Sequence, residues 1–338
     1  MSINNDNSTN AESGMGFGPA MLDFVAQLSA LPNDQLPLVL SMSLGSLSSY
    51  SCEYLCNQVA ANSSYSFSDC LDFASSQFQV CMFTNSQEDR MNTEFQKLGA
   101  RGLTAFAASG DGGAHFSFQP FPSSSELGTL LNEYSCAHIL PTYPAASPFV
   151  VAVGGTSINT GITSAWRASG GAFSIGPSFQ MLSFQNDAVS TYLTKYASNP
   201  DFPQPGSFDP TKRAYPDISA LSSDLPLVIN GRKTLGGGTS FAAPEVAGAF
   251  SLINDIRLNN GLPPLGFVSP RLYQVAADHP GAMFQDVVQG NNRCTSGGQC
   301  CDNGFPATPG WDAASGFGEL NWPGMVQYLA SDDSSSIL

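Results

Sequence analysis

The residue whose type and spacing best suit chemistry is a single serine in a run of small residues. Residues 236–248 read GGGTSFAAPEVAG, so Ser240 follows three glycines and a threonine. Pro244 fits the first turn of a helix, where a missing N–H is not needed, and apolar residues recur behind it at helical spacing. Such a turn exposes a hydroxyl beside free N–H groups at the positive end of a helix. Ser240 is therefore a candidate nucleophile, although serine also commonly caps helices.

A second candidate, Asp111, follows a short apolar run. Residues 103–108 predict a buried strand that leads directly into the segment SGDGG at 109–113. Residues just beyond the carboxyl ends of parallel strands face ligands in α/β proteins. An ionised carboxylate would repel an oxyanion, so Asp111 could help such a reaction only when protonated, which requires low pH or a raised pKa. The alternative is a structural aspartate that caps the following turn.

Alternating strands and helices must position these two residues. Helical spacing at 21–31 and 91–98 and apolar runs at 36–43 and 149–153 flank the run at 103–108, and the helix behind Ser240 should end at the pair 260–261. This alternation predicts an α/β fold with a parallel sheet and helices on both faces. A chain of 338 residues is long enough for one large domain.

The charge balance excludes one class of partner. Lys and Arg number 12 against 27 Asp and Glu, a formal net charge of -15, and no basic stripe is present for binding nucleic acid. No apolar run approaches the length needed to span a membrane. The acidity is consistent with simple solubility or with an acidic working compartment, where carboxylates would be partly protonated.

Eight cysteines point to disulfides in an oxidising compartment. Four of them lie in the Ser-rich stretch 48–85, which we interpret as a stapled surface insertion. A zinc site would need paired Cys-x-x-Cys or Cys/His sets, and the three histidines are scattered away from the cysteines. Asn7 and Asn62 stand in glycosylation sequons, which agrees with this compartment. The polar N-terminus, however, has no apolar signal core.

A serine nucleophile usually takes its base from a histidine oriented by an aspartate. His115 and His138 lie in polar segments and His279 precedes a proline, so we expect all three to be ordinary surface residues. This argues against a histidine-dependent subtilisin.

Taken together, the motifs resemble the sedolisins, the serine-carboxyl peptidases, and within them the tripeptidyl-peptidase branch. The resemblance runs from about residue 36 to about residue 328. Besides the serine block, it rests on segments in the family's order at 143–150, 153–157, 169–174, 213–217 and 264–273.

This resemblance implies a subtilisin-like α/β domain over residues 1–330. The polar, serine-rich residues 331–338 (SDDSSSIL) predict a disordered tail after it. It implies a lysosomal or secreted enzyme that acts on peptides or proteins at acid pH and releases tripeptides from free N-termini. Ser240 would attack the peptide carbonyl, protonated Asp111 would bind the oxyanion, and the segment Ser169, Gly170, Gly171 would bind substrate.

The base is where this chain departs from the family, which uses Glu-x-x-x-Asp on one helix face. No glutamate of the sequence is followed by an aspartate four positions later. In sedolisins the pair lies upstream of the segment that corresponds to 21–43, so we expect the chain to lack the signal, the propeptide and the N-terminal part of the catalytic domain. As given, it should have little or no peptidase activity. The alternative is a catalytically dead relative that binds peptides or serves as a secreted structural protein.

The resemblance also implies a calcium site near the C-terminus. Carboxylates of Asp286 and Asp312 and backbone carbonyls of Val287, Thr308 and Gly310 would be its ligands, all oxygen atoms as a hard cation requires. Cys294, Cys300 and Cys301 fall between the halves of this site. Disulfides there, one of which could reach Cys136, would pin the site, but the pairing cannot be read from the sequence.

Overall fold

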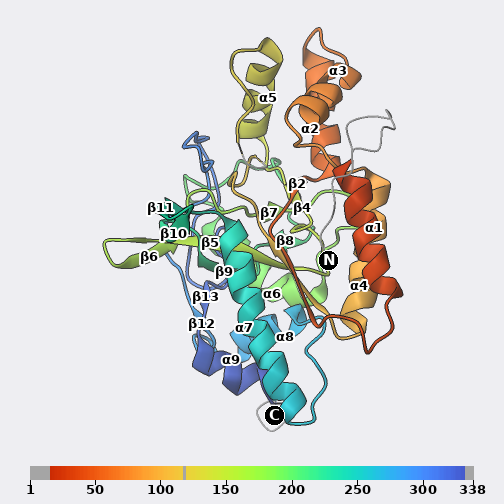
Figure 1. The fold of residues 1–338 in the computed structure, drawn as a ribbon. Helices are drawn as coiled ribbons and strands as arrows, with labels where there is room; N and C mark the ends of the chain where they lie inside the picture. The colour runs from red at the N-terminus through yellow and green to blue at the C-terminus, as the bar shows by residue number, and fades with distance from the viewer. Residues whose placement is uncertain (1–15, 117–118, 332–338) are drawn as a thin grey trace.

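A seven-stranded sheet forms the centre of the computed structural model, which describes residues 16–116 and 119–331 (Figure 1). The order is β1-β3-β5-β9-β13-β12, and β6 pairs with β5. The first five strands of this order run parallel, while β12 and β6 are antiparallel to their neighbours. The bounds are β1 Val39–Met42, β3 Thr104–Ala108, β5 Val151–Asn159, β6 Ile162–Ala165, β9 Ile218–Leu221, β12 Phe284–Gln285 and β13 Glu319–Leu320.

Helices cover both faces of this sheet, because successive strand residues point to opposite sides. Phe106 and Val153 pack with Phe250 of α7 on one face. Ala105 and Ala107 pack with Phe95 of α4 on the other face. This is the predicted α/β arrangement. The helices concerned are α1 Phe17–Ala30, α4 Asn85–Ala100, α6 Asn186–Tyr196, α7 Thr239–Asn259, α8 Ser269–Asp278 and α9 Trp322–Leu329.

The structure confirms the predicted end of the helix behind Ser240 but corrects its start. Asn260 is the C-cap of α7, as expected. Pro244, however, lies inside α7, at its sixth residue, rather than in the first turn. Its missing N–H therefore removes an intrahelical bond that would otherwise reach the carbonyl of Ser240.

The Ser- and Cys-rich stretch folds into helices that project from the body together with α5 (Glu126–Ala137), at the top of Figure 1. These helices are α2 Ser49–Asn62, α3 Phe67–Asp72 and a short π-helical turn, η1 Phe73–Gln77. Disulfides Cys52–Cys81 and Cys56–Cys70 cross-link them. Leu55 and Leu131 belong to a small core that these helices share with α5. The insertion is thus stapled as expected and also has a core of its own.

All eight cysteines are paired, the remaining two bonds being Cys136–Cys301 and Cys294–Cys300. The prediction of disulfides rather than a zinc site is confirmed. Disulfides of this number indicate an oxidising compartment.

A buried glutamate anchors the insertion to the sheet. Glu88 of α4 accepts hydrogen bonds from the Ser49 N–H (2.6 Å) and the Ser48 hydroxyl (3.0 Å), at the first residues of α2. Its side chain is fully buried, and this burial raises its pKa to about 8 despite those two donors. The Tyr143 hydroxyl donates to the Glu88 carbonyl and so connects the same point to β4 (Thr142–Tyr143).

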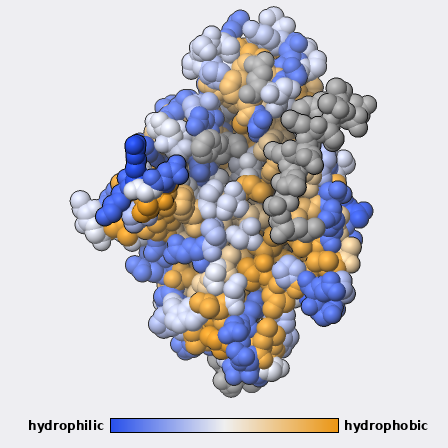
Figure 2. Space-filling view, in the orientation of Figure 1, coloured by the Kyte–Doolittle hydropathy of each residue, from blue (hydrophilic) through white to orange (hydrophobic). Residues whose placement is uncertain are grey.

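Short pairs of strands complete the fold. β2 (Ser46–Leu47) pairs with β4, β7 (Ala172–Phe173) pairs with β8 (Ala214–Tyr215), and β10 (Leu225–Ile229) pairs with β11 (Arg232–Gly236). The β10–β11 and β5–β6 hairpins project at the left of Figure 2, where the surface is partly orange; their exposed apolar residues are Ile158, Ile162, Val228, Ile229 and Leu235. Among the described residues, no helix has the length and apolar character to cross a bilayer. The predicted tail at 331–338 lies outside the described residues apart from Ser331, and so does the sequon at Asn7.

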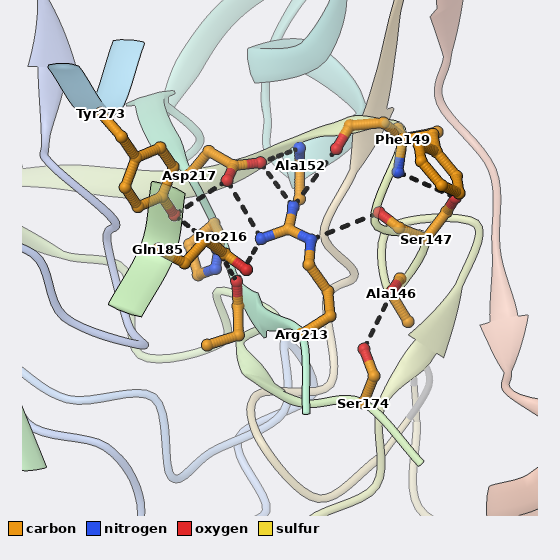
Figure 3. A network of polar contacts seen from close by, with 12 residues as sticks. Ala146, Ser147, Phe149, Ala152, Ser174, Gln185, Arg213, Pro216, Asp217 and Tyr273 are labelled. Carbon is orange, nitrogen blue, oxygen red and sulfur yellow. Dashed lines mark hydrogen bonds and ion pairs between the residues drawn. The ribbon is translucent and has the colours of Figure 1, made fainter. Parts of the chain in front are cut away.

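A buried ion pair joins several of these elements (Figure 3). Arg213 donates to both carboxylate oxygens of Asp217, at 3.0 and 2.6 Å, and neither side chain is more than 1% exposed. Asp217 also accepts from the Ala152 N–H of β5 (2.8 Å) and the Tyr273 hydroxyl of α8 (3.0 Å). The guanidinium donates further to the carbonyls of Ser147 and Val150. The pair therefore fixes the entry to the central strand β5.

We predict that Arg213→Met costs about 3–5 kcal/mol of unfolding free energy, because it leaves the Asp217 carboxylate buried without its partner. The double variant R213M/D217N should cost less than the sum of the two single changes, since the unpaired charge is then gone as well. Urea unfolding measures both quantities. Arg90→Met is the matched control: Arg90 is 59% exposed, and its buried partner Glu94 keeps a second ion pair with Lys97 at 3.0 Å, so the change should cost less than about 1 kcal/mol. Equal costs for Arg213→Met and Arg90→Met would contradict the prediction.

Candidate functional site

Ser240 lies at the second position of α7, on an exposed turn directly after Gly238. Gly238 has a φ of +131° and no side chain could be added to it freely, because a Cβ there would lie 2.8 Å from Oδ2 of Asp111. The glycines that precede Ser240 therefore bring the serine turn against the loop that follows β3. The sequence block identified above folds as a glycine turn that enters a buried helix.

Asp111 is held at this turn by Thr239. Its Oδ1 accepts hydrogen bonds from the Thr239 N–H (2.7 Å) and the Thr239 hydroxyl (2.9 Å). The same hydroxyl oxygen accepts from the Gly110 N–H at 3.1 Å, so Thr239 binds both the backbone and the side chain of the Asp111 loop. No donor among the described residues bonds to Oδ2 of Asp111. Oδ2 is therefore the oxygen on which a proton can reside and be donated.

Burial raises the pKa of Asp111, while the two hydrogen bonds from Thr239 lower it; burial is the larger effect. The side chain is only 9% exposed. Because its pKa is raised, Asp111 stays protonated to a higher pH than a free aspartate does. This is the property that the sequence analysis required of an oxyanion donor.

Ser240 and Asp111 line one cavity of about 190 Å³, which we call the serine cavity. Its other walls come from the residues after β1 (Ser43, Leu44, Gly45), from the end of β3 (Ala108) and from β4 (Thr142). The sequence analysis did not single out these residues as part of the site. Their only signal was their place at the end of a predicted strand, at 36–43 or 103–108, or beside the motif at 143–150.

Pro244 accounts for one contact in this wall. Because Pro244 has no N–H, the Ser240 carbonyl lacks its usual partner four residues later. The Ser43 hydroxyl donates to that carbonyl instead, at 2.8 Å. The proline of the serine block thus leaves the Ser240 carbonyl free to accept from Ser43, and this hydrogen bond joins the nucleophile turn to the cavity wall.

The predicted substrate-binding segment lies behind Asp111 rather than in the wall of the serine cavity. Ser169, Gly170 and Gly171 are buried. The Ser169 hydroxyl donates to the Ala314 carbonyl, and Gly170 donates its N–H to the Gly110 carbonyl at 2.8 Å. A Cβ on Gly170 would lie 1.9 Å from the Ser109 carbonyl oxygen. The close approach that the glycines permit is to this chain itself, so they support the Asp111 loop, and direct contact with substrate stays a prediction.

Comparison with known proteins agrees with this geometry. Residues 4–265 match the model of the Subtilase family, Peptidase_S8. The chain belongs to the subtilase family.

Relatives place this subtilase near the sedolisins, as its motifs predicted. It is 38% identical to tripeptidyl-peptidase 1 of Canis lupus familiaris over 247 residues, covering 71% of this chain and 39% of that protein. The human (Homo sapiens) tripeptidyl-peptidase 1 gives 38% over 246 residues with the same coverage, and physarolisin of Physarum polycephalum gives 35% over 259 residues, covering 68% of this chain and 42% of that protein. The chain therefore spans about two fifths of the length of these relatives.

A solved structure shares the fold. Pseudomonas sedolisin, a serine-carboxyl proteinase solved with two molecules of pseudo-iodotyrostatin, superposes with a TM-score of 0.60 and 21% identity, covering 94% of this chain and 71% of that chain. This confirms the predicted subtilisin-like architecture.

The histidines of this subtilase do not line the serine cavity, but one expectation about them was wrong. His115 is buried rather than on the surface, because the fold surrounds its ring with the carbonyls of Ser135, His138 and Asn303. His138 contacts the Tyr54 hydroxyl at 2.5 Å, and His279 stacks on Tyr328. Their ring contacts are therefore structural.

The five residues of the predicted calcium site are brought together. Oδ2 of Asp286 accepts from the Gly310 N–H (2.8 Å), and Oδ2 of Asp312 accepts from the Thr308 N–H (2.9 Å). Oδ1 of Asp312 is filled by three donors from Ala314 and Ser315. Val287, which directly follows Asp286, is buried.

These residues offer the oxygen ligands that a hard cation prefers. Asp286 is exposed, with the backbone N–H groups of Gly310 and Val287 beside its carboxyl, and the buried Thr308 hydroxyl has no hydrogen-bond partner. Two carboxylates alone are few ligands: the described residues include no group of three His, Cys, Asp or Glu that could hold a metal. Backbone carbonyls would have to supply the rest, as calcium sites commonly use.

Thr239 should control the protonation of Asp111. Thr239→Val removes a hydroxyl that stabilises the ionised form, so we expect the pKa of Asp111 to rise further and the unfolding free energy to fall by about 1–2 kcal/mol. A carbon-13 NMR titration of the aspartate carboxyls measures the pKa, with Asp111→Asn identifying the signal. Thr239→Ser keeps the hydroxyl and should restore both values. A Val variant with an unchanged or lowered Asp111 pKa would show that the contact only holds the turn.

Proposed function

We propose that this chain is part of an acid-active serine-carboxyl peptidase of the sedolisin type. The observation that carries the proposal is the shared cavity: its lining includes an exposed serine, Ser240, and a buried aspartate, Asp111, whose carboxyl is held in place by Thr239. Its similarity to tripeptidyl-peptidase 1 supports the finer proposal that it releases tripeptides from free N-termini.

In the proposed reaction, Ser240 Oγ attacks the carbonyl carbon of a peptide bound across the turn. The developing oxyanion accepts a hydrogen bond from Oδ2–H of Asp111 and one from the backbone N–H of Ser240, because the neighbouring N–H groups of Thr239 and Phe241 already donate to Asp111 and to the Gly238 carbonyl. The serine cavity, about 190 Å³ in volume, accepts the side chain next to the scissile bond. A carboxylate base of the Glu-x-x-x-Asp kind would have to accept the proton of Ser240; this sequence contains no such pair, so the step requires a base from outside it.

The working environment follows from the same chemistry. A carboxylate base and a protonated Asp111 both suit acid conditions, because carboxyl pKa values lie near about 4. The disulfides suit an oxidising compartment. We therefore propose a lysosomal or secreted location, with peptides or proteins as substrates.

The decisive experiment compares the chain alone with the chain carrying its authentic upstream segment. With that segment present, a fluorogenic tripeptide substrate should be cleaved at about pH 4, and Ser240→Ala should abolish the cleavage. Asp111→Asn should lower the rate yet extend cleavage to higher pH, because an amide donates a hydrogen bond at every pH whereas an aspartate must first be protonated. The chain alone should show little activity.

A second candidate function is peptide binding without catalysis, which the missing carboxylate pair favours. Peptide binding without cleavage, even with an upstream segment attached, would establish this alternative. Cleavage that survives Ser240→Ala would refute both.

We further propose that Ca²⁺ binds between Asp286 and Asp312, with the carbonyls of Val287, Thr308 and Gly310. Free Ca²⁺ at a hundred times its Kd should stabilise the fold by about 2.7 kcal/mol, and EGTA should reverse this. Calorimetric unfolding with and without Ca²⁺ tests the proposal. Asp286→Asn should lose the Ca²⁺ effect, while the surface variant Asp278→Asn should keep it. No shift with Ca²⁺ in the unsubstituted chain would contradict the site.

A further inference from the structure

A second cavity differs from the serine cavity in charge. It has a volume of about 640 Å³, and its lining includes Trp166, Arg167, Ser223, Asn291 and Arg293. We call it the arginine cavity. It lies where β6 ends and where the chain approaches β10, at the base of the two projecting hairpins.

Two contacts connect the walls of the arginine cavity with the nucleophile turn. The carbonyl of Ser222, next to the lining residue Ser223, accepts the Gly238 N–H at 2.7 Å. Ser296, close to the lining residue Cys294, donates its N–H to the Asp111 carbonyl at 2.9 Å. The segments that line the arginine cavity are therefore bonded to the Asp111 loop and to the approach to Ser240, both of which belong to the serine cavity. A peptide lying across Ser240 with one end in the serine cavity extends toward the arginine cavity.

The charge of this cavity is unusual for the chain. Only 12 of 338 residues are Lys or Arg, and two of them line this one cavity. No carboxylate among the described residues lies within ion-pair distance of Arg167. Arg293 reaches Asp201 only at 3.9 Å, with both side chains about half exposed, and such a pair is weak. Asp224 also lines the cavity, so the two guanidinium groups leave a net positive charge.

The remaining polar groups also suit an anion. The Ser223 hydroxyl is buried and has no hydrogen-bond partner. The side-chain amide of Asn291 can supply N–H donors next to the guanidinium groups. Arginine binds carboxylates through two parallel N–H donors, a geometry that lysine lacks.

We propose that the arginine cavity binds a carboxylate of the peptide on the opposite side of the scissile bond from the group in the serine cavity. The carboxylate is an acidic side chain or the C-terminal carboxylate of a short peptide. This inference rests on the proposed peptidase function, because it assumes that a peptide lies across Ser240.

Binding of matched peptides tests the inference without requiring cleavage. Four peptides share one sequence and differ only in Glu or Gln at the positions after the scissile bond, and in a free or amidated C-terminus. Their affinity for the chain is measured by isothermal titration at about pH 5.5, where both kinds of carboxylate are largely ionised. We expect the carboxylate peptides to bind about fivefold more tightly than the neutral peptide, and this advantage to shrink as salt is added.

The variants locate the effect. Arg167→Gln and Arg293→Gln should each reduce the advantage, and both together should abolish it. Lys195→Gln removes an exposed positive charge on α6 and should leave the advantage intact. All three residues are exposed or half-buried, and thermal unfolding checks that each variant is folded. If only a free C-terminus increases the affinity, the cavity binds the C-terminal carboxylate. If only Glu increases the affinity, the cavity binds an acidic side chain.

The inference is overturned if neutral and acidic peptides bind equally, or if the double arginine variant keeps the full preference. Its failure is distinct from failure of the peptidase proposal. Cleavage of all four peptides at equal rates would leave the peptidase standing and remove the carboxylate subsite. If the carboxylate preference depends on Arg167 but no peptide is cleaved when the upstream segment is present, the carboxylate subsite stands and the peptidase proposal fails. Absence of any peptide binding would remove both.

Discussion

The contact between Asp111 and Thr239 is the constraint on which the site depends. These residues are 128 positions apart, yet three hydrogen bonds join the loop after β3 to the first residue of α7. They fix Oδ1 of Asp111 as an acceptor and so leave Oδ2 as the only oxygen that can donate. Gly238 permits the approach, because any side chain there would collide with that oxygen. One threonine thus holds the Asp111 carboxyl beside the serine turn, while burial raises the pKa of Asp111 against the two hydrogen bonds from Thr239.

A hydrogen bond from Ser43 to the Ser240 carbonyl holds the other side of the nucleophile turn. Pro244 cannot donate to the Ser240 carbonyl, and Ser43 uses the acceptor that is left. Ser43 directly follows β1, the neighbour of β3 in the parallel sheet. Both strand ends therefore reach the same turn from the same edge of the sheet. The buried Arg213–Asp217 pair orients β5, on the other side of β3, so three successive strands are positioned by polar contacts rather than by apolar packing alone.

Features of the fold and the site could be predicted when they depend on neighbouring residues in the sequence, and not when they depend on residues far apart in it. The serine turn and the loop of Asp111 could be predicted because each is encoded by a few consecutive residues. The same holds for β3, α4 and the end of α7. The hydrogen bond of Ser43 to Ser240 spans 197 positions and has no local signal. His115 was misjudged for a related reason: its polar neighbours in the sequence suggested exposure, but the carbonyls around its ring come from two other segments, the end of α5 and the loop at Asn303. The segment 169–171 shows a third limit, since paired glycines permit close approach without revealing to what.

Burial of carboxyl groups connects the site with the conditions proposed for it. Glu88 is fully buried with a pKa of about 8, against about 4.5 for a free glutamate, so it is neutral in the folded chain and ionised in the unfolded chain between these values. The unfolded state then binds fewer protons, and stability falls as pH rises from about 4.5 towards 8. Burial also raises the pKa of Asp111. Loss of the proton from Asp111 and from Glu88 therefore destabilises the fold in the same direction, at the candidate site and at the anchor of the insertion. In a chain with a net charge of -15, acid also relieves repulsion across the surface. The raised pKa values of these two buried carboxyl groups therefore favour the folded state, and proton donation from Asp111, as the pH falls.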